Sequence, residues 1–188
     1  MGNVAEEEIL RGMYLLRHAE AADSMPRVQL LGSGPILNEA VRAADLLRES
    51  FGVAADVWSV TSWTELRRDA LSFDRSEVLG TPKPGVAYFT ERMAATTGPI
   101  IAATDYMKSL PDGLARWSPR RMVALGTDGF GRSDGRAALR DFFEVDARHI
   151  AYAAIRELAR ASRVPADVVT RAERELDIDV NRPDPATR

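Results

Sequence analysis

Short apolar stretches that alternate with amphipathic segments constrain the fold of this chain more than any single motif does. Apolar runs bounded by glycine or polar residues are typical of buried strands, whereas apolar residues at helical spacing are typical of amphipathic helices. Alternating strands and helices predict one α/β domain, with a parallel sheet that helices cover on both faces. The predicted strands are 27–34, 56–63, 99–105 and 121–128, and the predicted helices are 35–48, 64–79, 88–95, 106–117 (broken), 134–143, 147–161 and 165–176.

The segment that precedes the first of these strands follows a different pattern. Residues 9–17 are typical of an extended stretch, and residues 18–26 are polar and end in proline, which is typical of a loop. We therefore expect an N-terminal extension and linker at 1–26, followed by the α/β domain at 27–188.

Composition excludes several classes of protein. Hydrophobic residues make up 45% of the chain, enough for a real core, and the formal net charge of −3 argues against general nucleic-acid binding, which needs a basic surface. The absence of cysteine excludes disulfides and thiolate nucleophiles. No window approaches the ~20 apolar residues of a membrane span, and the acidic start MGNVAEEEIL lacks the apolar core of a secretory signal. We expect a cytoplasmic protein that binds neither nucleic acid nor membrane.

A Gly-Ser-Gly turn at 32–34 is the first candidate site. It resembles the opening of a dinucleotide-binding fingerprint, in which backbone N–H groups at a helix N-terminus hold a pyrophosphate. Leu37 stands where the third glycine belongs, and Pro35 lacks one of the required N–H donors. The pattern therefore favours a tight strand-to-helix turn with Gly34 at the cap over a phosphate site.

The stretch GRSDG at 131–135 is the second candidate, because it matches the nucleophile elbow G-x-S-x-G. His149 follows Ser133, with acidic residues between them, so a hydrolase triad is conceivable. An elbow needs the strand to run directly into the serine, however, and here the apolar run ends at Leu125. We therefore interpret Ser133 and Asp134 as caps of the next helix.

Metal and polyanion sites have little support in the sequence. The only two histidines, His18 and His149, lie far apart and lack a neighbour at a usual ligand spacing. Asp128 and Asp134 fit no calcium-loop pattern, so no metal site is predicted. The basic cluster RWSPRR at 116–121 is more typical of a solvated loop than of a binding patch. Three apolar residues outside the clear periodic pattern are interpreted most simply as apolar fill, that is, as side chains that only pack against others: Met107, Met122 and Phe130.

Several longer sequence segments, taken in order, resemble those of one protein family. The chain contains VQLLGSG, DVWSVTSWTELRRDA, ATDYMKSLPDGLARW, VALGTDGFGRSDGRAALRDFFEVDARHIAYAAI and the ending NRP. In this order they resemble the C-terminal domain of the homodimeric pyruvate dehydrogenase E1 component, over residues 7–183. The segments TDYMK and GTDGFGRSD are the most specific to this family.

The resemblance implies a three-layer α/β/α domain of the transketolase C-terminal type, with a mostly parallel five-stranded sheet. Enzymes of that family use thiamine diphosphate and magnesium to decarboxylate pyruvate, and then transfer the acetyl group to lipoyl-E2. The resemblance also implies that the cofactor-binding and catalytic residues belong to other domains, so we assign no catalytic, cofactor or metal residue here. Implied partners are the rest of the E1 chain, its dimer mate and E2.

One loop remains as a candidate interface with those partners. Its glycines allow sharp turns, and an aromatic side chain and an arginine, both common anchors at interfaces, lie beside them. The candidate interface loop is Asp128, Gly129, Phe130, Gly131, Arg132, Ser133 and Asp134. Two alternatives stay open: a stand-alone hydrolase that uses Ser133 and His149, and a stand-alone or regulatory ligand-binding module with its site at the carboxyl ends of the strands.

Overall fold

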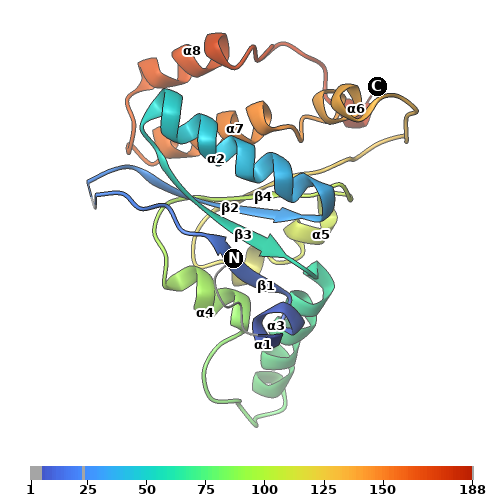
Figure 1. Cartoon of the computed structure of the whole chain (residues 1–188). Coiled ribbons are helices and arrows are strands. Elements are labelled where there is room, and N and C mark those ends of the chain that lie inside the picture. Colours follow the sequence, from blue (N-terminus) through green and yellow to red (C-terminus); the bar gives the residue numbers. More distant parts are fainter. Residues whose placement is uncertain (1–5, 23, 188) are drawn as a thin grey trace.

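A five-stranded sheet forms the centre of the molecule, a computed structural model that describes residues 6–22 and 24–187 (Figure 1). The strand order is β1-β3-β2-β4-β5. Neighbouring strands from β3 to β5 are parallel, and β1 is antiparallel to β3. This confirms the mostly parallel five-stranded sheet. The strands are β1 (Met13–Arg17), β2 (Arg27–Ser33), β3 (Ala54–Val60), β4 (Ile100–Ala103) and β5 (Met122–Leu125).

Helices lie close to their predicted positions. The one expected to be broken, at 106–117, is a four-residue helix followed by a 3-10 turn. None of the helices in the described part of the chain is long and apolar enough to cross a membrane. The α-helices are α1 (Glu6–Leu10), α2 (Leu37–Phe51), α3 (Trp63–Val78), α4 (Tyr88–Ala94), α5 (Ser109–Asp112), α6 (Arg136–Phe142), α7 (Ala147–Arg160) and α8 (Ala166–Glu175); the 3-10 helices are η1 (Gly34–Ile36), η2 (Ala115–Trp117) and η3 (Pro185–Thr187).

Helices pack against both faces of the sheet, as Figure 1 shows for α2 and α7 on one side and α3 and α4 on the other. The larger core lies under α2 and α7 and includes Leu30, Leu47 and Ile155, all of which are fully buried. The second core lies under α3 and α4 and is centred on Leu66 and Phe89. Two cores on one sheet confirm the three-layer α/β/α architecture.

Part of the segment 1–26 is a strand of the sheet and not a linker. Met13–Arg17, which we placed in the N-terminal extension, forms strand β1, and Met13 pairs with Val60 of β3. Met13 is fully buried, so this strand belongs to the sheet. Alternation of strands and helices could not reveal it, because an antiparallel edge strand needs no crossover helix. Residues 1–5 and 23 of the predicted extension lie outside the described residues.

The Gly-Ser-Gly segment forms the tight turn that leads from β2 into η1 and α2. Gly34 has a φ of 53°, in the left-handed region that favours glycine. A Cβ on Gly32 would lie 2.8 Å from Cα of Leu37, closer than such atoms approach, so glycine lets strand and helix pack together. These two constraints explain both glycines structurally.

Candidate functional site

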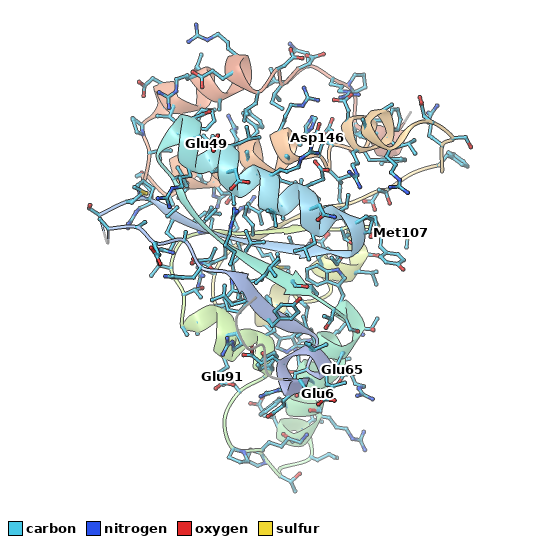
Figure 2. The ribbon with its side chains drawn as sticks, in the orientation of Figure 1. Glu6, Glu49, Glu65, Glu91, Met107 and Asp146 are labelled. Carbon is cyan, nitrogen blue, oxygen red and sulfur yellow. The ribbon has the colours of Figure 1, made fainter. Side chains whose placement is uncertain are left out.

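Two loops leave the sheet side by side at the carboxyl ends of β4 and β5. The first runs from Thr104 to Lys108, and the second, from Gly126 to Gly135, contains the candidate interface loop. Carboxyl ends of neighbouring parallel strands lie at the same edge of a sheet, which is the usual location of sites in open α/β folds. Figure 2 shows Met107, from the first loop, at the edge toward which the β2 arrowhead points.

Hydrogen bonds join these two loops into one unit. The backbone N–H of Thr127 donates to the Tyr106 carbonyl at 2.9 Å, and the Thr127 hydroxyl donates to the Asp105 carbonyl at 2.8 Å. The Asp128 carboxylate accepts from the backbone N–H of Lys108 at 2.9 Å. Asp128, the first residue of the candidate interface loop, therefore holds the loops together and is no free ligand.

Two glycines of the second loop are required by close approach. A Cβ on Gly126 would lie 2.6 Å from the Tyr106 carbonyl oxygen, so this position needs glycine for the loops to meet. Gly129 has a φ of 98°, and a Cβ there would lie 3.0 Å from Cα of Ala186 in η3. Gly131 has open space around it. The loop is thus fixed at 126 and 129, and beyond them it projects from the fold.

Three large apolar side chains stand exposed on these loops. The exposed fractions are 62% for Tyr106, 59% for Met107 and 82% for Phe130. The interpretation of Met107 and Phe130 as apolar fill is therefore wrong, whereas Met122 is partly buried and packs against the second core. We call Tyr106, Met107 and the loop 128–134 the carboxyl-edge surface.

The end of the loop differs from the sequence-based interpretation. Helix α6 begins at Arg136 with Gly135 at the N-cap, and no side chain caps it, so the assignment of Ser133 and Asp134 as caps is wrong. The Asp134 carboxylate instead accepts from the Gly135 N–H. The Arg132 guanidinium lies 4.7 Å from the ring centre of Phe142, which orients the last part of the carboxyl-edge surface by a cation–π contact.

The two members of the conceivable hydrolase triad have different surroundings. Ser133 is exposed in the loop, whereas His149 is buried in the first turn of α7. Nδ1 of His149 lies 2.7 Å from a carboxylate oxygen of Asp146, which also accepts from the backbone N–H of His149 at 3.0 Å. Asp146 is the N-cap of α7. This pair stabilises a helix start, and no hydrogen bond among the described residues joins it to Ser133.

Asp141, Asp146 and His149 bring one possible ligand atom each within 4.8 Å of the others, a cluster that the sequence analysis missed. The i,i+3 spacing of Asp146 and His149 could have revealed half of it. Arg148 donates to Asp146 at 3.0 Å and to Asp141 at 2.5 Å, and Arg182 donates to Asp141 at 2.9 Å. Because two arginines already neutralise the carboxylates, the cluster is an ion-pair network that ties the C-terminal segment to α6 and α7.

We expect Asp146→Asn to reduce stability at neutral pH but not at low pH. Burial raises the pKa of Asp146, but bonds from His149 and the charge of Arg148 outweigh it and lower the pKa from 3.8 to about 2. The ionised carboxylate therefore contributes about 2 kcal/mol above pH 3.8. That contribution is lost as the pH falls through about 2. Asparagine caps helices as well as aspartate does, so the variant removes mainly the charge.

Urea unfolding of the two proteins at pH 7 and at successively lower pH measures this difference. Asp134→Asn is the matched control and should be neutral, because Asp134 is exposed and has no ion pair with any described residue. A stability difference that stayed constant down to the lowest pH would contradict the assignment of the effect to the Asp146 charge.

The layer order and strand topology define an α/β domain of the transketolase C-terminal type. Transketolase from Leishmania mexicana superposes with a TM-score of 0.55 at 20% identity, covering 85% of this chain and 20% of that chain. A split-gene transketolase, described as an inactive β4 tetramer, superposes with a TM-score of 0.53 at 18% identity, covering 80% of this chain and 43% of its own. The family model for the transketolase-like TK C-terminal domain matches residues 12–146, and the chain belongs to that family.

Curated relatives narrow the resemblance to one enzyme. The pyruvate dehydrogenase E1 component of Pseudomonas aeruginosa is 46% identical over 183 residues, which cover 96% of this chain and 21% of the relative. Those of Escherichia coli and Cupriavidus necator are 42% and 41% identical, and each match covers 96% of this chain and 20% of the relative. The chain spans about a fifth of the length of these relatives and matches their C-terminal part. The sequence-based recognition is thereby confirmed.

Proposed function

We propose that this chain is the C-terminal, non-catalytic assembly domain of a thiamine-diphosphate-dependent pyruvate dehydrogenase E1 component. The complete enzyme would decarboxylate pyruvate and transfer the acetyl group to lipoyl-E2. The rest of the E1 chain and its dimer mate are the proposed partners of the carboxyl-edge surface, and E2 is a further partner of the whole enzyme. A cytoplasmic location belongs to the same proposal.

The observation that carries this proposal is the carboxyl-edge surface. Its loops are held rigidly by hydrogen bonds and by close-packed glycines, yet they expose Tyr106, Met107 and Phe130 to solvent. Exposed apolar area costs free energy that only contact with another surface recovers. Rigid loops that present aromatic and arginine side chains match the anchors that dominate protein interfaces.

Neither the Asp141–Asp146 cluster nor the turn at Gly34 fits a diphosphate–magnesium unit. The carboxylates of the Asp141–Asp146 cluster are already bonded to arginines. In the turn at Gly34 the next residue is Pro35, which has no N–H to donate to a phosphate. We therefore propose that thiamine diphosphate and magnesium are held by parts of the enzyme outside this chain, and no catalytic step is assigned to its residues.

We expect Phe130→Ala/Arg132→Ala in the complete polypeptide to weaken subunit assembly about 1,000-fold, since anchor residues contribute about 2 kcal/mol or more each, and every ~1.4 kcal/mol is tenfold. Sedimentation equilibrium over a concentration series measures the dissociation constant. Val78→Ala/Arg75→Ala is the matched control, because it removes an exposed apolar side chain and an arginine from α3, away from this surface. Equal dissociation constants for the wild type and the Phe130/Arg132 variant would contradict the proposal.

A second candidate, ligand binding, is favoured by a cavity of about 440 Å³ at the same edge. It lies beside the ends of β2 and β4, where the chain order of the strands reverses, the usual ligand position in open sheets. Ile36 and Val145 form part of an apolar floor, and Arg136 on the rim has no ion pair with any described residue. Carboxylate ligands that raise the melting temperature of this chain, but not of its Arg136→Gln variant, would support this function.

A further inference from the structure

A cavity of about 660 Å³ lies at the opposite edge of the sheet, where the parallel strands begin. In Figure 1 this edge is the one away from the arrowheads of β2 and β3. The residues that line it come from the starts of β2, β4 and β5 and from the end of α7. Its volume is typical of small-molecule sites, which measure roughly 300–1,000 Å³. Five of its lining residues are arginines: Arg27, Arg120, Arg121, Arg160 and Arg163.

Most of this positive charge is not neutralised by the protein. Arg27 pairs with Asp56 at 2.7 Å, and Arg121 pairs with Glu157 at 2.8 Å. The other three arginines form no ion pair with a carboxylate of the residues that the structure describes. Three like charges around one cavity repel each other, and an anion in the cavity would offset that repulsion. The chain as a whole carries a net charge of −3, which makes this concentration of positive charge more distinctive.

Arg120 strengthens the argument because it is partly buried. Its guanidinium donates to the Met93 carbonyl at 2.7 Å, to the Thr96 hydroxyl at 2.5 Å and to the Gly98 carbonyl, all of which are neutral. Burial lowers the pKa of Arg120, and no carboxylate offsets that cost. A desolvated cation without a counter-charge is expensive. These bonds hold Arg120 at the cavity wall, and they leave its positive charge without a negative partner.

We propose that this cavity binds a small molecule that carries two or more linked phosphate groups. Guanidinium groups bind phosphate oxygens through paired N–H donors, and three unneutralised arginines match a polyanion better than a single charge. Met25, Pro99 and Ala161 supply apolar wall on which an organic part of the ligand can rest. The site faces away from the carboxyl-edge surface and is independent of the assembly role proposed for that surface.

Calorimetric titration of this chain with inorganic pyrophosphate tests the proposal. We expect saturable 1:1 binding, and affinity at least about tenfold lower in Arg160→Gln/Arg163→Gln, because that variant removes two charged donors. Both arginines are exposed and make no side-chain bond that supports the fold, so the variant should remain folded. Arg75→Gln/Arg174→Gln, exposed arginines of α3 and α8, is the matched control for net charge and should bind within about twofold of the wild type.

Four outcomes would overturn the proposal. One is the absence of pyrophosphate binding at millimolar concentration. Another is equal weakening in the two double variants, which would indicate general charge attraction. The third is binding of a polyglutamate peptide, lost in the Arg160/Arg163 variant, without binding of pyrophosphate, which would identify the cavity as a docking site for an acidic segment. Tighter binding of pyrophosphate than of orthophosphate is the expected result, and equal affinities would contradict the requirement for linked phosphates.

Discussion

Gly98→Ala is expected to prevent the chain from folding to its native state. Gly98 has a φ of 81°, and a Cβ there would lie 1.7 Å from the carbonyl oxygen of Arg27 and 2.6 Å from its carbonyl carbon. Both atoms are backbone at the start of β2, so no side-chain rotation can relieve the overlap. The methyl group could be accommodated only by separating the starts of β2 and β4, where the Gln29 N–H donates to the Pro99 carbonyl at 2.9 Å.

The matched control for this variant is Gly80→Ala. Gly80 also has a positive φ, 69°, but nothing lies within 4 Å of the position that its Cβ would take. That substitution should cost only the left-handed backbone strain of about 1–2 kcal/mol. Far-ultraviolet circular dichroism and urea unfolding distinguish the two. A Gly98→Ala protein as stable as Gly80→Ala would show that the β2–β4 approach is not tight at this point.

Asp56→Ala is expected to destabilise the chain by about 3–5 kcal/mol, the usual cost of removing one partner of a buried ion pair. Its buried carboxylate accepts hydrogen bonds from the Arg27 guanidinium at 2.7 Å, the Gln29 amide at 2.9 Å and the Ala19 N–H at 2.9 Å. Burial raises the pKa of Asp56, but these bonds together outweigh it and hold the pKa below 3.8. The variant would leave the fully buried Gln29 amide with a single acceptor, the Thr97 carbonyl.

Asp45→Ala is the control for this second variant. Asp45 pairs with Arg17 at 2.8 Å, but the side chains are 52% and 38% exposed, and such solvent-exposed pairs contribute about 0–1 kcal/mol. Because the pKa of Asp56 is depressed, its contribution is present above pH 3.8 and is lost as the pH falls below it. Equal losses for Asp45→Ala and Asp56→Ala in urea unfolding at pH 7 would contradict the central role of the buried carboxylate.

The candidate interface could be located from the sequence only in part. The apolar run before Gly126 and the helical pattern after residue 134 mark the loop as the connection at the end of a strand, and the structure has it there. Met107 and Phe130 were misjudged because an apolar side chain in a loop packs inside or remains exposed depending on what covers the loop. The cap was misplaced because serine, aspartate and glycine all favour the N-cap, and local preference does not choose between neighbours.

The arginine-lined cavity could be predicted from sequence motifs even less than the candidate interface. Arg120 and Arg121 belong to a basic cluster that is visible in the sequence and was interpreted as a solvated loop. Arg27, Arg160 and Arg163 lie far from that cluster along the chain, and nothing in their spacing relates them to it. They line one cavity because the starts of parallel strands and the end of α7 meet at one edge of the sheet.

The sequence by itself determined the α/β class, the positions of most helices and strands, and the family. Periodicity and turn residues act within one segment, so they can be recognised without knowing its neighbours. Only the tertiary structure decided the pairing of β1, the exposure of the carboxyl-edge surface, the Asp141–Arg148–Asp146 network and the convergence of five arginines. Each of these depends on which segments, distant in sequence, the assembled sheet brings together, and that is set by packing and not by local pattern.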